Sequence, residues 1–282
     1  MLRLANRNLQ VELLDPADDA ARRGPRYCRG GYIWQVHDVA RGPLVSGPEY
    51  PHPDPTPFNG QGLPESLRHR TRDGRPLTWR GAEGLGIGIG KLSAGAGNDV
   101  KLEEPCSWAV SGDSTQLVFQ TRQEAAGFAC ELSRKVELRD RAVVSATQLT
   151  NVGPTALNLQ WFAHPFWALS GGRARVNLPD GTTLPENPGF AVDAAGVLTF
   201  RRPFVTPKDD QFALLSLPPG RPLAVTLDHP FLPGVAFSTD FAPDECPVWA
   251  NARTISVEPY LNLAIPPGET RHWSAEHRFL PV

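Results

Sequence analysis

Short apolar runs, separated by turn-forming residues, dominate the pattern of this chain. In its middle part, Gln116–Arg122, Gly127–Leu138 and Ala142–Thr150 alternate between apolar and polar positions. This period of two is typical of a strand that buries one face and exposes the other. Turn-forming residues such as Asp113 and Asp140 separate neighbouring runs. The pattern therefore predicts an all-β chain built from many antiparallel strands.

The same pattern extends over most of the sequence and gives further expected strands. These are Leu9–Leu14, Tyr32–Val39, Leu85–Leu92, Val100–Val110, Ala156–Ala163, Arg173–Leu178, Gly196–Phe200, Gln211–Leu217, Leu223–Leu227, Val235–Thr239, Thr254–Glu258 and Arg271–Phe279. Asp15–Gly24 carries the start and stop signals of a short helix, with a charged loop as the alternative. Gly42–Gly62 is rich in proline and glycine and is expected to be a long loop. Since no repeat or linker divides the chain, we expect one large antiparallel β-sandwich domain over residues 1–282.

Composition narrows the class of protein without changing this fold prediction. The 282 residues carry a formal net charge of −2, which gives no electrostatic case for binding nucleic acid or an anionic membrane. No apolar run approaches the roughly 18 residues that a membrane span needs. The chain's cysteines are widely spaced, and no signal peptide is apparent at the N-terminus. We therefore expect Cys28, Cys106, Cys130 and Cys246 to be reduced thiols in a cytoplasmic protein.

Candidate chemistry lies where two apolar strands end at a proline. His164 precedes Pro165 between aromatic residues, and Glu258 precedes Pro259. Proline cannot donate to a strand ladder, so each side chain is free to leave its sheet. An imidazole and a carboxylate suit general acid–base catalysis. A structural histidine and a solvated edge charge are the alternatives for these two residues. The seven histidines show no metal-ligand spacing, so no metal site is expected.

Several motifs together resemble the aldose 1-epimerase, or galactose mutarotase-like, superfamily. A turn at Asn151-Val152-Gly153 leads into a strand that ends at His164-Pro165-Phe166, and Glu258-Pro259 and the turn Pro266–Glu269 follow later. The resemblance covers the chain from about Val143 to the C-terminus. It implies a large twisted β-sandwich in which His164 protonates the ring oxygen of a hexose. Glu258 then takes the proton from the anomeric hydroxyl, and no metal or organic cofactor is needed.

The resemblance also implies residues that hold the sugar. The family has an aspartate in a D-[D/H]-x-[F/Y] pattern, which both Asp209 and Asp228 match. We choose Asp209, because two further expected strands then lie between it and the strand of Glu258, as in the family. The family's N-terminal arginine and its second histidine, often in a His-Gly pair, have no direct match. Arg68 and His69 are the nearest chemical substitutes.

The resemblance implies interconversion of the α and β anomers of a hexose or hexose derivative. One alternative is a hexose-phosphate epimerase of the same fold, which needs several arginines; Arg68, Arg70 and Arg72 alternate, although they also fit a solvated turn. Another alternative is a non-catalytic carbohydrate-binding or regulatory module. From hydrogen-bond reach, we expect the side chains of His164 and Glu258 to face each other roughly 5–8 Å apart with one sugar between them. The identity of the sugar and the oligomeric state do not follow from the sequence.

Overall fold

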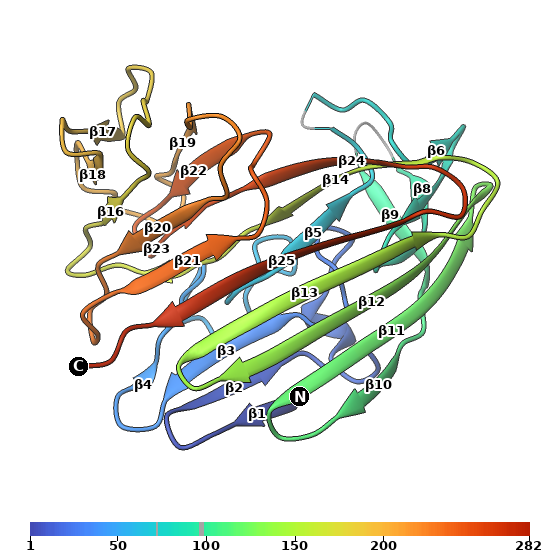
Figure 1. The fold of residues 1–282 in the computed structure, drawn as a ribbon, viewed down its shortest axis with the longest axis horizontal. Helices are drawn as coiled ribbons and strands as arrows, with labels where there is room; N and C mark the ends of the chain where they lie inside the picture. Colours follow the sequence, from blue (N-terminus) through green and yellow to red (C-terminus); the bar gives the residue numbers. More distant parts are fainter. Residues whose placement is uncertain (72, 96–98) are drawn as a thin grey trace.

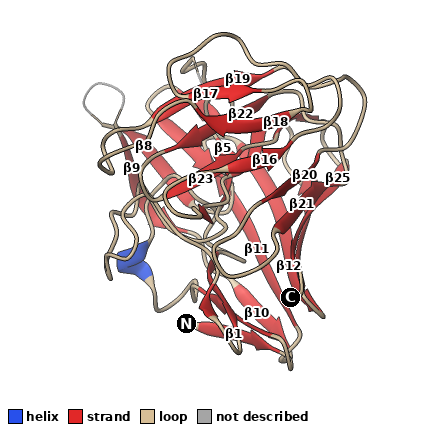
Figure 2. Cartoon of the chain, turned by 90° about the vertical axis from the view of Figure 1, so that its left-hand side faces the viewer, coloured by secondary structure: helices blue, strands red, loops and turns tan. Residues whose placement is uncertain are grey.

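Antiparallel strands make up most of the computed structural model, which describes residues 1–71, 73–95 and 99–282 (Figure 1). The strands form five sheets. Within the described residues, the one helical element is the short 3-10 helix η1 (Ala20–Arg22), seen at one side of the molecule in Figure 2. The predicted all-β sandwich is therefore confirmed. Asp15–Gly24, for which a short helix and a charged loop were both open, is a loop that contains this single turn.

The largest sheet holds ten strands. They are β10 (Ala109–Gly112), β11 (Gln116–Ala125), β12 (Phe128–Arg139), β13 (Ala142–Asn151), β16 (Arg175–Asn177), β17 (Phe190–Val192), β18 (Val197–Phe200), β20 (Ala224–Leu227), β21 (Val235–Thr239) and β25 (Thr270–Phe279). Their spatial order is β10-β11-β12-β13-β25-β21-β20-β16-β18-β17. The C-terminal strand β25 thus lies between β13 and β21 and joins the middle of the chain to its last third.

Four smaller sheets complete the sandwich. The first contains β1 (Leu2–Ala5), β2 (Leu9–Leu13), β3 (Ile33–Asp38) and β4 (Gly42–Pro43), and the second contains β6 (Trp79–Arg80), β7 (Glu83–Gly86), β8 (Gly90–Ala94) and β9 (Val100–Pro105). A three-stranded sheet has the order β24 (Tyr260–Ile265), β14 (Leu157–Ala163) and β5 (Glu65–Arg68). The last sheet has the order β15 (Trp167–Ala168), β23 (Thr254–Val257), β22 (Cys246–Ala250) and β19 (Gln211–Leu215). Strands β14 and β23 lead directly into the two candidate catalytic residues.

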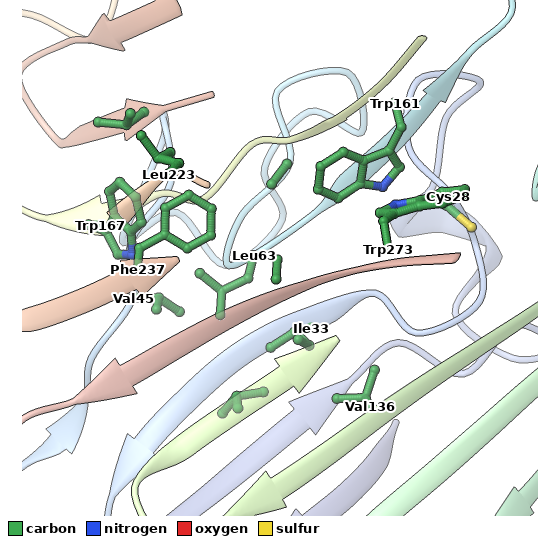
Figure 3. Packing of buried hydrophobic residues seen from close by; sticks show 14 of the residues in the cluster. Cys28, Ile33, Val45, Leu63, Val136, Trp161, Trp167, Leu223, Phe237 and Trp273 are labelled. Atoms are coloured by element: carbon green, nitrogen blue, oxygen red, sulfur yellow. The ribbon is translucent and has the colours of Figure 1, made fainter. Parts of the chain in front are cut away.

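Buried aromatic side chains join the small sheets to the ten-stranded sheet (Figure 3). Trp161 of β14 packs edge-on against Trp273 of β25, with 6.1 Å between the ring centroids. Trp167 of β15 packs against Phe237 of β21 at 5.2 Å. All four side chains belong to one hydrophobic cluster. Because a close-packed interior resists distortion, this core fixes the ends of β14 and β15, between which His164 lies.

Two predicted strands are wrong in their extent. Leu85–Leu92 is a hairpin rather than one strand, because Gly88 and Gly90 adopt φ of +74° and +143° at the turn between β7 and β8. Glycine reaches this region without the steric cost that a side chain brings. Val100–Val110 is divided into β9 and β10, with residues 106–108 outside both strands. In the long loop predicted over Gly42–Gly62, strand pairing is confined to the two residues of β4 and a bridge at Val45.

Candidate functional site

His164 and Glu258 follow the last residues of two strands, as the prolines after them predict. Strand β14 ends at Ala163 and strand β23 ends at Val257. Each backbone is then fixed by a hydrogen bond to a neighbouring segment. The His164 N–H donates to the Pro64 carbonyl at 2.9 Å, and the Glu258 N–H donates to the Pro247 carbonyl at 2.8 Å. The two residues are therefore held on well-anchored backbone while their side chains are free of the ladders.

The imidazole and the carboxylate form a buried pair. Each residue is only 4% exposed, and His164 Nε2 lies 3.5 Å from Glu258 Oε1. On its other side, His164 Nδ1 is at hydrogen-bond distance, 3.1 Å, from Ser256 Oγ. The two side chains face each other, but the expected spacing of 5–8 Å with one sugar between them is wrong. The physical reason is burial, because a carboxylate removed from water is stabilised by moving close to a polar partner.

Aromatic rings surround the imidazole. The His164 ring centroid lies 4.4 Å from that of Phe166, 6.1 Å from that of Trp249 and 6.2 Å from that of Tyr27. The Arg26 guanidinium stacks over the Tyr27 ring at 5.0 Å. Burial, with a smaller contribution from the positive charge of Arg26, holds the pKa of His164 well below its ordinary value. The environment therefore favours the neutral imidazole at neutral pH.

A cavity of about 490 Å³ lies near this pair, although neither His164 nor Glu258 is part of its lining. Phe162 and Tyr260 line it, and their rings are stacked with centroids 4.5 Å apart. Phe162 precedes His164 by two residues and its ring lies 5.8 Å from the imidazole, while Tyr260 follows Glu258 by two residues. The stacked rings thus connect the cavity to the acid–base pair.

The cavity also contains Arg68 and His69, the two residues proposed from the N-terminal third. Arg68 Nη1 donates to the Tyr260 hydroxyl at 3.4 Å, and Arg68 Nη2 donates to the Thr71 carbonyl at 3.2 Å. The Trp79 Nε1–H donates to His69 Nδ1 at 2.8 Å. Burial and the neighbouring arginines lower the pKa of His69 to about 4. His69 is therefore neutral near pH 7, and its Nδ1 is already engaged.

Asp209 does not line this cavity. Its carboxylate is bound by the Arg202 guanidinium through two hydrogen bonds of 2.7 and 2.8 Å. The alternative, Asp228, lines a different cavity. The structure therefore places Arg68 and His69 in one cavity and His164 with Glu258 in a separate buried pair. Neither aspartate lines that cavity. Arg72, considered from sequence as part of an arginine cluster, lies outside the described residues.

Three residues at the site were missed from sequence. Tyr260 is next to Pro259, so its position after the Glu258-Pro259 pair was an available signal. No sequence signal pointed to Arg26 or Ser256, because a charged loop residue and a serine within an apolar strand are common throughout proteins.

Among the described residues, no group of three histidine, cysteine, aspartate or glutamate side chains is arranged to hold a metal ion. In that same part of the chain, no helix is long and apolar enough to cross a membrane.

Comparison with known proteins shows a shared fold. No family model and no curated protein matches the sequence. A galactose mutarotase-related enzyme from Lactobacillus acidophilus is similar in structure, with a TM-score of 0.61, 11% identity, and coverage of 99% of this chain and 96% of the other. A putative aldose 1-epimerase from Escherichia coli K12 gives a TM-score of 0.58 and 13% identity, with 99% and 98% coverage. The galactose 1-epimerase of Lactobacillus acidophilus NCFM gives 0.54 and 12%, with 98% and 93% coverage. The chain therefore has the galactose mutarotase-like sandwich fold.

Proposed function

We propose that this protein binds a hexose or hexose derivative and interconverts its α and β anomers by acid–base ring opening. The observation that carries the proposal is the buried His164–Glu258 pair beside an aromatic cavity. The fold-level likeness to aldose 1-epimerase structures supports the same reaction class. Membership of that superfamily is part of the proposal, since the shared identity is low.

The reaction requires one proton acceptor and one proton donor at the same carbon. Glu258, as the carboxylate, takes the proton of the anomeric hydroxyl while His164, as the imidazolium, protonates the ring oxygen. The bond between C1 and the ring oxygen breaks and a carbonyl forms at C1. Rotation about the C1–C2 bond and the reverse proton transfers close the ring on the other face. The two reacting oxygens share one carbon, so two groups only 3.5 Å apart can reach both of them from one side.

The cavity walls suit a sugar. Phe162 and Tyr260 offer aromatic carbon for the apolar face of a pyranose ring. Arg68 is placed to donate hydrogen bonds to hydroxyl oxygens, because it lies on a cavity wall and its Nη1 and Nη2 each have a second N–H group beyond the bonds to Tyr260 and Thr71. Ser256, at 3.1 Å from Nδ1, fixes the imidazole with Nε2 directed toward Glu258. This orientation is the one that the proton transfer needs.

Polarimetry of freshly dissolved sugars tests the proposal. We expect the wild-type protein to accelerate mutarotation of at least one sugar in a panel. The Glu258→Gln variant should lose about 10²–10⁴-fold in turnover, because the shape of the side chain is kept and only the base is removed. Binding of the same sugar, measured by calorimetry, should remain largely intact. Binding without acceleration by the wild type would instead favour a non-catalytic carbohydrate-binding module.

A second candidate, a hexose-phosphate epimerase, is favoured by the charges of the cavity. Arg26, Arg68 and Arg70 all line it, and Asp99 is the one acidic residue among its described lining. Arg70 Nε is buried and has no hydrogen-bond partner among the described residues. An anionic substituent on the sugar would satisfy these groups, since guanidinium groups pair well with phosphate oxygens. Acceleration of a phosphosugar, but not of its neutral parent, would establish this candidate over the first.

A further inference from the structure

A second cavity, of about 620 Å³, is lined by four arginines. They are Arg173, Arg175, Arg201 and Arg202, and Asp228 is the one acidic residue in the described lining. No residue of this cavity also lines the cavity beside His164. The concentration of positive charge is therefore a separate feature of the molecule, and the proposed sugar chemistry does not use it.

The pairing of β16 with β18 brings these arginines together. Arg175 lies opposite Thr199 in the register of the two strands. Arg173 precedes the first residue of β16 by two positions, and Arg201 directly follows the last residue of β18. All four side chains border one cavity. Like charges gathered on neighbouring strands repel each other, so this arrangement is unfavourable without a counter-charge.

In the described part of the chain, three of the four arginines lack a carboxylate partner, unlike several other arginines on the surface. Arg122 pairs with Glu131, Arg139 with Glu137 and Arg278 with Glu276. In the four-arginine cavity, Arg202 is bound by Asp209, which lies outside the lining. Among the described residues, no carboxylate forms a salt bridge with Arg173, Arg175 or Arg201. Their positive charge is thus available to a ligand.

We propose that this cavity binds a small molecule that carries a diphosphate-type group. A guanidinium binds phosphate oxygens through two parallel N–H bonds, and the three arginines without a salt bridge to a described carboxylate exceed what a single phosphate needs. Exposed ion pairs are individually weak in water, so a ligand must engage several arginines at once. The volume is that of a small-molecule site. Phe200 also lines the cavity and offers an aromatic surface for an organic part of the ligand.

Calorimetry with inorganic pyrophosphate, at low ionic strength, tests this site directly. We expect wild-type protein to bind pyrophosphate at least about tenfold more tightly than orthophosphate, because only the former spans several arginines. The variant Arg173→Gln/Arg175→Gln should bind it about tenfold or more weakly. Both side chains are exposed, so the variant should fold as the wild type does, which a matching unfolding midpoint would verify.

The matched control is Arg122→Gln/Arg139→Gln, which removes the same charge from exposed positions on β11 and β12. This control should leave pyrophosphate affinity within about twofold of wild type. Failure of the wild type to bind pyrophosphate would overturn the proposal. Equal weakening in both double variants would also overturn it, because affinity would then follow net charge alone. The measurement needs no turnover, so its outcome is independent of the proposed epimerase activity.

Discussion

A buried ion pair beneath the site gives the sharpest stability prediction. Glu65 of β5 and Arg134 of β12 form a salt bridge with 2.7 Å between Glu65 Oε2 and Arg134 Nη2. Their side chains are 6% and 1% exposed. The Trp161 Nε1–H also donates to Glu65 Oε2 at 2.9 Å, and Arg134 donates to Ser145 Oγ and to the Gly30 carbonyl. The pair thus ties β5, whose Ser66 and Arg68 line the candidate sugar cavity, to the ten-stranded sheet.

Glu65→Gln removes the negative charge while retaining an oxygen for the Trp161 N–H. The Arg134 guanidinium then stays charged in the core, where its Nε already has no hydrogen-bond partner among the described residues. Breaking one side of a buried pair in this way costs about 3–5 kcal/mol of unfolding free energy. The double variant Glu65→Gln/Arg134→Met should recover most of that loss, because the buried charge is removed and its volume is filled by an apolar chain.

Urea unfolding followed by fluorescence measures both variants, and Glu131→Gln serves as the exposed control. Glu131 pairs with Arg122 on the surface, with side chains 52% and 65% exposed, so its loss should cost no more than about 1 kcal/mol. If Glu65→Gln lowered the unfolding free energy no more than Glu131→Gln does, Arg134 could not be desolvated as described. If the double variant were no more stable than Glu65→Gln alone, the loss of stability would come from packing and not from the unpaired charge.

Two pH dependences complete the predictions. The proposed catalysis needs the His164 imidazolium, whose pKa is held well below its ordinary value by burial and by Arg26, so turnover should fall as pH rises through an apparent pKa below 6.5. Arg26→Gln should move that limb of the pH–rate profile to higher pH, and an unmoved limb would exclude Arg26 as a cause. Burial lowers the pKa of His277 to about 3, so the unfolded chain binds one more proton than the folded chain between about pH 6.5 and 3. Stability should therefore be full above pH 6.5 and fall on acidification, and His277→Asn should reduce the slope of unfolding free energy by about 1.4 kcal/mol per pH unit. An unchanged slope would show that His277 becomes protonated in the folded protein.

The parts of the site that local chemistry dictates could be predicted from sequence. A proline after His164 and another after Glu258 were sufficient to end two strands, because proline lacks the N–H that a ladder needs. The glycines of Leu85–Leu92 were not sufficient, since alternating glycine fits both the bare face of a strand and a tight turn. The positive φ of Gly88 and Gly90, which only the structure shows, distinguishes the two.

The pairing of side chains that are far apart in the chain could not be predicted from the sequence. The spacing of His164 and Glu258 depends on how deeply both are buried, and no local pattern encodes that depth. The pairing of Asp209 was hidden for a similar reason, because Arg202, seven residues away, binds its carboxylate. Arg26 lies in a charged loop, and its approach to Tyr27 and His164 depends on the packing of segments far apart in the sequence.

Two buried ionisable pairs among the described residues differ in a way that bears on function. The Glu65–Arg134 pair is close, at 2.7 Å, and Trp161, Ser145 and Gly30 supply further hydrogen bonds, which is how a permanently charged structural pair is held. His164 and Glu258 stand at 3.5 Å, beyond the usual hydrogen-bond length, and both groups can gain or lose a proton. A pair kept for stability alone is replaceable by apolar residues at little cost. A looser, titratable pair next to a cavity is instead what a proton-transfer site requires, since each group must reach a substrate atom in turn.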